Sequence, residues 1–155
     1  MGSETERKFL VRGDGWKGQV TRSRTIVQAY LASTPAAAIR VRISDEASAT
    51  LTLKSAEPGM TRSEFEYDIP LEDARQLLEL RTGTTIEKRR HIVPAGSLAW
   101  EVDVFGGAHE GLVMAEIELP SQDIAFERPD WLGEEVTGDR RYYNASMALG
   151  EDAKD

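Results

Sequence analysis

The chain has 155 residues, 40% hydrophobic and 30% charged, which is typical of one globular domain. It contains no cysteine, so disulfide bonds, thiol nucleophiles and cysteine-ligated metal centres are excluded. The net charge of −8 and the lack of an apolar run of roughly 20 residues argue against nucleic acid and membranes as partners. We expect a single cytoplasmic domain over 1–155, monomeric or homodimeric, with a core at about 4–149 and a polar tail at 150–155.

Alternating apolar and polar residues predict eight β-strands. In the third of them, Ile39 and Val41 point to one side while Arg40 and Arg42 point to the other. Turns that contain glycine, proline or short polar residues separate the strands. In chain order the predicted strands span 3–11, 25–31, 38–43, 49–54, 62–69, 85–93, 98–105 and 112–119.

One strongly amphipathic helix is predicted over 70–80, between the fifth and sixth strands. Pro70 opens it and acidic residues occupy its first turn, as helix starts favour. Its apolar stripe consists of Leu71, Ala74, Leu77 and Leu78. After the last strand, two short helices are predicted near 122–126 and at 139–149.

Like charges stand two residues apart in six of the predicted strands. Residues at i and i+2 of a strand share a face, and adjacent like charges repel, so an ordinary solvent-facing surface would mix the signs. The acidic pairs are Glu4/Glu6, Glu64/Glu66, Glu101/Asp103 and Glu116/Glu118, and the basic pairs are Arg40/Arg42 and Lys88/Arg90, joined by the single residues Lys8 and Lys54. Such sorting by sign is favourable where the charges face a ligand that needs them.

Two arrangements of these faces are compatible with the alternation. An antiparallel sheet of eight strands closes into a barrel wide enough for one small ligand. With the charged faces inside, the apolar faces would be covered by helices, and the buried charge would require a polyanion with divalent cations. With the apolar faces inside, the charges would face solvent. The alternation alone does not choose between them.

The residue types indicate the chemistry of the inward arrangement. Arginine binds phosphate oxygens with two parallel hydrogen bonds, and lysine binds them as a point charge. Paired carboxylates suit hard cations such as Mg²⁺. Together they would supply positioning, charge neutralisation and an oriented water for phosphoryl transfer. The sequence has neither a glycine-flanked serine elbow nor a Walker-type loop.

The opening segment Glu4-x-Glu6-x-Lys8 resembles the ExExK motif of the CYTH, or triphosphate tunnel metalloenzyme, superfamily. Further segments follow in that family's order and extend the resemblance over about 4–149. They are Gln28-Ala29-Tyr30-Leu31, Ile39-Arg40-Val41-Arg42, Thr52-Leu53-Lys54, Glu64-Phe65-Glu66-Tyr67, Glu87-Lys88-Arg89-Arg90, Glu101-Val102-Asp103-Val104-Phe105, Ala115-Glu116-Ile117-Glu118 and the tail from Trp131 to Tyr142.

The resemblance implies an α+β, mainly β, fold: an eight-stranded antiparallel tunnel-shaped β-barrel with a charged lumen and helices packed on the outside. It also implies the roles of individual residues. Metal ligands are Glu4, Glu6, Glu116 and Glu118, with Asp103; phosphate-binding residues are Lys8, Arg40, Arg42, Lys54, Lys88 and Arg90. Catalytic residues are Lys8, its tyrosine partner Tyr30, and Glu6 or Glu118 to orient water. Apart from the resemblance, we expect Glu64, Glu66 and Glu101 to be secondary lumen acids, and Glu64 and Glu66 to balance the basic residues rather than bind metal.

We therefore expect a Mg²⁺- or Mn²⁺-dependent hydrolase of a small triphosphate, with inorganic triphosphate as the simplest substrate because a short chain leaves few insertions for a base or thiazole pocket. Three alternatives remain: an adenylyl cyclase of the family's class IV, a thiamine or nucleoside triphosphatase, and a non-catalytic module that binds polyphosphate or nucleotide. Fold resemblance does not choose among them, because function belongs to the site. Tyr30 is also compatible with a purely structural role in the barrel.

Overall fold

The structure is a computed structural model that describes residues 2–55 and 61–149, without the side chains of 2–4 and 62. The polar tail expected at 150–155 lies outside this part of the chain. The strands are β1 (Gly2–Val11), β2 (Arg22–Ser33), β3 (Ala37–Ser44), β4 (Ser48–Ser55), β5 (Thr61–Ile69), β6 (Thr82–Ala95), β7 (Leu98–Phe105), β8 (Val113–Leu119) and β9 (Leu132–Glu135). The α-helices are α1 (Leu71–Leu78) and α2 (Asn144–Leu149), and the 3₁₀ turns are η1 (Lys17–Gln19), η2 (Gly107–His109) and η3 (Arg140–Tyr142).

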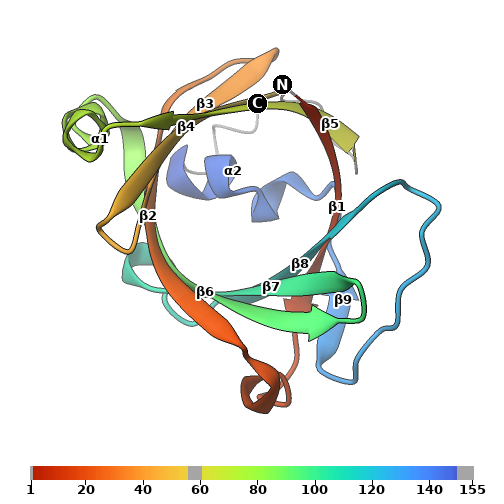
Figure 1. Ribbon diagram of the computed structural model, residues 1–155. Helices are drawn as coiled ribbons and strands as arrows, with labels where there is room; N and C mark the ends of the chain where they lie inside the picture. Colours follow the sequence, from red (N-terminus) through yellow and green to blue (C-terminus); the bar gives the residue numbers. More distant parts are fainter. Residues whose placement is uncertain (1, 56–60, 150–155) are drawn as a thin grey trace.

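One antiparallel sheet wraps around to form a tunnel (Figure 1). Its strand order is β5-β4-β3-β2-β6-β7-β8-β1-β9, and an additional pairing of β5 with β1 joins the two sides. The first half of β1 pairs with β5 and its second half with β9, while its other edge pairs with β8 from Thr5 to Leu10. The predicted mainly β tunnel fold is confirmed, and all eight predicted strands are present.

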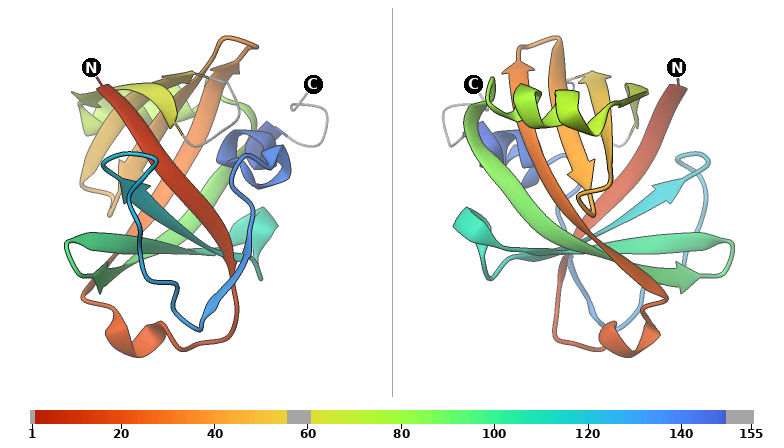
Figure 2. Two further views of the ribbon diagram at one scale, coloured as in Figure 1. Left: turned by 90° about the vertical axis from the view of Figure 1, so that its right-hand side faces the viewer. Right: turned by 60° about the vertical axis from the view of Figure 1, so that its left-hand side comes forward.

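The charged faces of the strands point into the tunnel. In β3, Val41 is fully buried on the outer side, beneath α1, whereas Arg40 and Arg42 line the interior. Helix α1 lies across the outside of β2, β3 and β4, where Ala74 belongs to one buried apolar cluster with Ala29 and Val41 (Figure 2). Of the two arrangements that the alternation allows, the structure has the one with charge inside.

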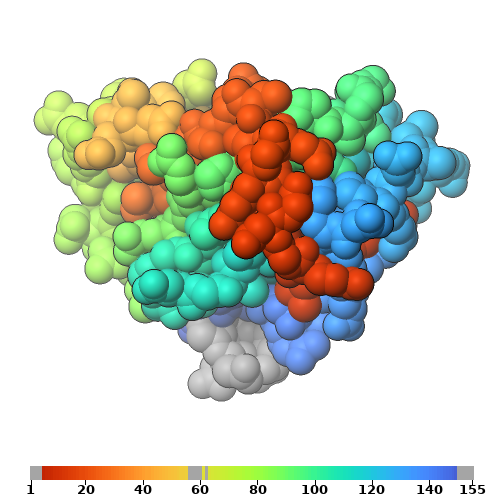
Figure 3. Space-filling view, turned by 90° about the horizontal axis from the view of Figure 1, so that it is seen from below, coloured from red at the N-terminus to blue at the C-terminus, as the bar shows by residue number. Residues whose placement is uncertain are grey.

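A second apolar cluster covers the outside of β1, β7 and β8. Trp100 packs edge to face against Phe9 and against Trp131, with ring centroids 5.6 Å apart in each of these two pairs. The segment around η1 closes this side, where the backbone N–H of Arg12 donates to the carbonyl of Trp131, and Figure 3 shows the orange-red η1 segment beside the blue C-terminal third. Apolar surface outside the tunnel is thus buried by loops as well as by α1.

The prediction of a helix near 122–126 is wrong. This stretch is irregular, with a turn at 122–123, and it runs between Pro120 and Pro129. Its extended path places the Phe126 ring 5.7 Å from Trp100 and 6.2 Å from Phe9. Packing against the outer aromatic cluster therefore outweighs the weak local helix preference.

The helix predicted at 139–149 is divided in two, and it does not lie on the outside of the sheet. Asp139 caps η3 by accepting from the backbone N–H of Arg141, and Tyr143 is extended before α2 begins. Helix α2 crosses one end of the tunnel, as Figures 1 and 2 show. A side chain at Gly83, which has φ +69°, would collide with the carbonyl of Ala148, so this close approach requires glycine.

In the described part of the chain, no helix is long and apolar enough to cross a membrane.

Candidate active site

Charged and polar side chains line a cavity of about 780 Å³ inside the tunnel. Almost every residue that the sequence predicted for the site contributes to this lining. They are Glu6, Lys8, Tyr30, Arg40, Arg42, Lys54, Glu64, Glu66, Lys88, Arg90, Glu101, Glu116 and Glu118. Asp103 lies behind this lining, and Glu4 is placed on β1 by its backbone while its side chain is outside the described residues.

Strand register gathers the carboxylates on one wall of the cavity. In antiparallel pairs, directly opposite residues point to the same face. Glu6 of β1 lies opposite Glu118 of β8, and Lys8 lies opposite Glu116. Glu101 of β7 is opposite Glu116 on the other side. Three neighbouring strands therefore place their acidic residues side by side, with Lys8 among them.

Basic residues of β3, β4 and β6 line the remaining wall. Arg40 is buried and donates from Nη2 to Thr52 Oγ1 at 3.2 Å. Its Nη2 also lies 3.9 Å from Glu66, and Lys54 Nζ lies 3.6 Å from Glu64. Glu64 and Glu66 thus pair with basic residues, the arrangement expected of secondary lumen acids.

Asp103 is a fully enclosed counterion for two cations. Arg90 donates to both of its carboxylate oxygens at 2.8 Å, and Lys88 Nζ lies 2.8 Å from one of them. Burial raises the pKa of Asp103, but Arg90 and Lys88 outweigh burial and lower it to about 2. The carboxylate therefore stays ionised and holds both cations in place from behind.

Crowding of cations changes the acid–base properties of the basic wall. Burial, with repulsion from Arg90 and Arg42, lowers the pKa of Lys88 to about 7 although Asp103 opposes the shift. Burial and the neighbouring Arg40 and Arg90 likewise lower the pKa of Arg42 to about 9. The pKa of Arg90 is raised because Asp103 and Glu101 outweigh burial. An anion that entered the cavity would relieve this repulsion.

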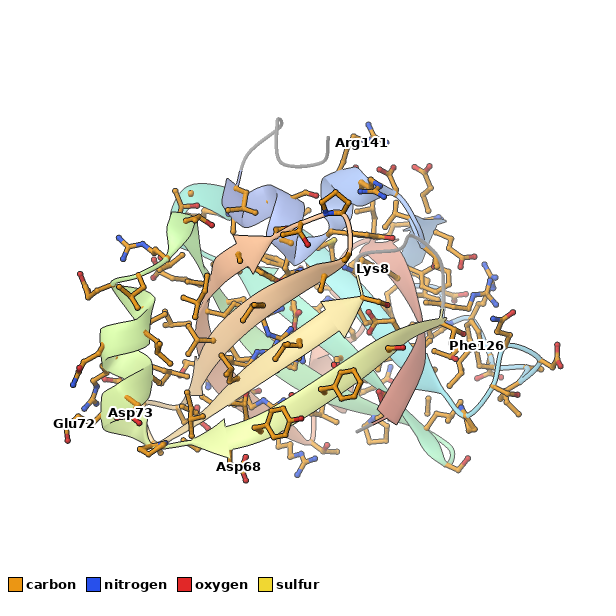
Figure 4. All side chains as sticks on the ribbon, turned by 90° about the horizontal axis from the view of Figure 1, so that it is seen from above. Lys8, Asp68, Glu72, Asp73, Phe126 and Arg141 are labelled. Carbon is orange, nitrogen blue, oxygen red and sulfur yellow. The ribbon has the colours of Figure 1, made fainter. Side chains whose placement is uncertain are left out.

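Lys8 projects into the cavity below the C-terminal segment, as Figure 4 shows. Its Nζ donates to the carbonyl of Tyr142 at 2.9 Å and lies 3.9 Å from Glu116. The ring of Tyr143 is 5.7 Å from the same nitrogen. Tyr30, the tyrosine that the resemblance implied as its partner, lines the same cavity from β2. Tyr143 is thus a tyrosine with a direct contact to the lysine, whereas Tyr30 shares only the cavity with it.

The acidic wall has a donor set that fits a hard divalent cation. Burial raises the pKa of Glu116, but Lys8, a hydrogen bond with Glu6, and Arg90 hold it well below its usual value. Among the side chains that the structure describes, no three carboxylate or imidazole groups come close enough to hold an ion alone. Mg²⁺ commonly uses one or two carboxylates with water and substrate phosphates, and the Glu6–Glu116 pair with Glu118 opposite meets that requirement.

Several lining residues were not predicted from the sequence. Arg24 lies on the same face of β2 as Tyr30, and its buried Nε has no hydrogen-bond partner among the described residues. The alternation from Arg24 through Gln28 to Tyr30 could have revealed it, but the strand predicted at 25–31 leaves Arg24 out, whereas β2 begins at Arg22. The C-terminal segment also contributes lining residues, namely Arg140, Tyr143 and Asn144. This segment has no strand pattern from which they could be predicted.

Known proteins resemble this chain over nearly its whole length. The model of the CYTH domain family matches residues 2–146. The chain is 42% identical over 148 residues to the inorganic triphosphatase of Acetivibrio thermocellus. This alignment covers 95% of this chain and 94% of that protein. It is 37% identical over 153 residues to the inorganic triphosphatase of Nitrosomonas europaea. This alignment covers 95% of this chain and 97% of that protein.

A solved structure gives the same result for the fold. The crystal structure of an inorganic triphosphatase superposes with a TM-score of 0.67 at 35% identity, covering 95% of this chain and 98% of the other. Family match, sequence identity and tunnel architecture agree, and the chain belongs to the CYTH domain family.

Proposed function

We propose that the protein hydrolyses the terminal phosphate of a triphosphate inside the tunnel, and that inorganic triphosphate is its substrate. The observation that carries this proposal is one cavity in which a basic wall faces an acidic wall. The two curated relatives, aligned over 95% of this chain, are both inorganic triphosphatases.

The basic wall would bind the phosphate chain. Arginine side chains suit bidentate contact with phosphate oxygens, and lysines add point charges. Arg40, Arg42 and Arg90 supply the first kind of contact, and Lys54 and Lys88 supply the second. Because they come from three strands of a rigid sheet, they would hold the triphosphate in one orientation. Such positioning supplies much of the catalysis of phosphoryl transfer.

The acidic wall would hold Mg²⁺ or Mn²⁺ through Glu6, Glu116 and Glu118, with Glu4 on the same strand. When bound, the metal ion neutralises phosphate charge and acts as a Lewis acid. Asp103 has a different role in this proposal, because both of its oxygens already bind Arg90 and one of them also meets Lys88. It would position the cations rather than ligate metal.

Hydrolysis would proceed by in-line attack of water on the terminal phosphorus. Glu6 or Glu118 would accept a proton from the water as its oxygen bonds to phosphorus. The bond to the bridging oxygen would break at the same centre, and pyrophosphate would leave. Lys8 would stabilise the negative charge that develops on the phosphate oxygens, with the Tyr30 hydroxyl as a further donor.

The proposal is tested by phosphate release from a panel of triphosphate, pyrophosphate, ATP and thiamine triphosphate, with Mg²⁺ and Mn²⁺ compared. Preferred release from inorganic triphosphate supports it. Preferred release from thiamine triphosphate or ATP would assign another triphosphatase activity. Cyclic AMP formed from ATP would assign a cyclase. Tight metal-dependent binding without turnover of any compound would make the protein a binding module.

We expect Arg24→Ala to raise the KM for triphosphate roughly tenfold to 100-fold, the range for losing one charge-assisted contact. Arg24 lines the cavity and its Nε is buried without a hydrogen-bond partner in the described structure, so a bound phosphate would give it one. Steady-state kinetics would measure the effect. Arg89→Ala is the matched control, because Arg89 is exposed on the outside of β6. Equal KM values for the two variants would remove Arg24 from the site.

Triphosphate binding should take up a proton through Lys88. Its pKa of about 7 leaves the amine mostly neutral above that pH, and a bound phosphate would favour the ammonium form. Proton uptake should therefore appear between pH 7 and about 10, the ordinary lysine value, and affinity should fall as pH rises through that window. Calorimetry of metal-free triphosphate binding at pH 8, in buffers of different ionisation enthalpy, measures the uptake. Lys88→Met should bind with less uptake than the wild type, and equal uptake would contradict the assignment.

A further inference from the structure

The C-terminal segment that crosses one end of the tunnel is hydrogen-bonded to the basic wall through Asn144. Its Oδ1 accepts from Lys88 Nζ and from Gln28 Nε2, both at 2.9 Å. Gln28 is fully buried on β2, and its Oε1 accepts from Arg42 Nε at 2.7 Å. A single side chain on α2 is therefore linked directly to one cation and, through one amide, to another.

This arrangement fixes which way the Gln28 amide points. With Nε2 toward the acceptor Asn144 and Oε1 toward the donor Arg42, each contact joins a donor to an acceptor. Turning the amide over would place donor against donor at Arg42 and acceptor against acceptor at Asn144. Asn144 thereby determines the orientation of Gln28, and Gln28 determines that of the Arg42 guanidinium.

Asn144 and Gln28 form a hydrogen-bonded link between two cations, Lys88 and Arg42, that have no direct contact through their own strands. Arg42 lies on β3 and Lys88 on β6, with β2 between them. Both line the cavity, and both have pKa values lowered by burial and by neighbouring cations. Groups that repel one another keep a fixed spacing only when neutral partners hold them. Asn144 and Gln28 are such partners, and they add no negative charge that would compete with phosphate.

We propose that Asn144 is a positioning residue that sets the spacing of Arg42 and Lys88 for a phosphate chain, so that the C-terminal segment is part of the substrate-binding site. The inference rests on the proposed function for the identity of the ligand. It goes beyond that function because it assigns a role in affinity to a residue outside the charged strand faces. A purely structural Asn144 would affect the stability of α2 and leave affinity unchanged.

The test compares Asn144→Ala with Arg141→Ala, a control on the same segment. Arg141 is exposed, pairs with Asp139 and points away from the tunnel (Figure 4). Asn144→Ala should raise the KM for triphosphate about tenfold, the effect of weakening hydrogen bonds to charged groups, and change kcat less than about twofold. Arg141→Ala should match the wild type in both. An unchanged KM in Asn144→Ala would overturn the proposal.

A double-mutant cycle separates positioning from loss of packing. Asn144→Ala and Gln28→Ala remove parts of one network, so their combined effect on KM should be smaller than the product of the single effects. Independent, multiplying effects would contradict the network. Asn144→Asp retains the acceptor atoms and should keep the melting temperature, but its added charge should weaken triphosphate binding more than alanine does. Wild-type binding by this variant would place Asn144 away from the ligand.

Calorimetric binding of metal-free inorganic triphosphate makes failure of this inference distinguishable from failure of the proposed function. If the wild type binds triphosphate without hydrolysing it, the triphosphatase proposal fails, and the loss of affinity in Asn144→Ala still tests the positioning role. If hydrolysis is confirmed and Asn144→Ala binds as tightly as the wild type, the positioning role alone is refuted. Wild-type protein that neither binds nor hydrolyses triphosphate would refute both.

Discussion

Lys8→Ala should hydrolyse inorganic triphosphate at least about 100-fold more slowly than the wild type while remaining folded. Lys8 is buried, and its ammonium lies on the acidic wall, 3.9 Å from Glu116. Loss of one preorganised group that stabilises transition-state charge commonly costs about 10²- to 10³-fold in kcat. Single-turnover kinetics, with the protein in excess over triphosphate, would measure the chemical step apart from product release.

The matched control for this prediction is Lys17→Ala. Lys17 is an exposed lysine in η1 whose Nζ lies 3.2 Å from Asp14, so its replacement removes the same charge outside the tunnel. Its turnover should equal that of the wild type. Near-normal turnover by Lys8→Ala would exclude the lysine from the reaction, whereas equal losses in both variants would point to net charge rather than to the site.

Asp103→Ala should lower the free energy of unfolding by about 3–5 kcal/mol, the range for removing one partner of a buried ion pair. The change would leave Lys88 and Arg90 buried without the carboxylate that contacts both. Urea denaturation monitored by tryptophan fluorescence would measure it. Asp68→Ala, which removes an exposed carboxylate of β5 (Figure 4), should change stability by less than about 0.5 kcal/mol.

The same residue separates two roles for the lumen carboxylates. If Asp103 positions cations, Asp103→Asn should bind Mn²⁺ with nearly wild-type affinity although it is less stable, whereas Glu6→Gln should bind Mn²⁺ more weakly. Electron paramagnetic resonance of free Mn²⁺ would measure both affinities. Much weaker Mn²⁺ binding by Asp103→Asn would show that Asp103 is a metal ligand, as the family resemblance implied. A small stability loss in Asp103→Ala would show that its contacts with Arg90 are dispensable.

Strand periodicity made the fold predictable because the two sides of this sheet differ so strongly in charge. The secondary-structure predictions failed in segments with little periodicity. Strand β9 has four residues, including Gly133, and is held by pairing with β1 rather than by its own pattern. The 122–126 stretch resembled a helix locally, but Phe126 packs on the outer aromatic cluster. Strand β9 pairs with β1, and Phe126 also packs on Phe9 of β1, so both outcomes depend on residues more than 100 positions away.

The candidate site was predictable to the extent that it lies on strand faces. Spacing of two residues identified Arg40 and Arg42, and their shared cavity follows from the register. Spacing does not distinguish a carboxylate that faces the cavity from one enclosed by cations, so Asp103 looked the same as Glu101. Asn144 belongs to a segment whose position depends on how α2 docks against the end of the tunnel, and no local pattern encodes that docking.

The proposed activity of this tunnel is hydrolysis of inorganic triphosphate. Phosphorus-31 NMR of triphosphate incubated with the protein and Mg²⁺ or Mn²⁺ tests it most directly, because substrate and both products give separate signals. We expect triphosphate to disappear while pyrophosphate and orthophosphate grow in equal amounts, and chelation of the metal to stop the reaction. A triphosphate signal that remains unchanged with either metal would contradict it.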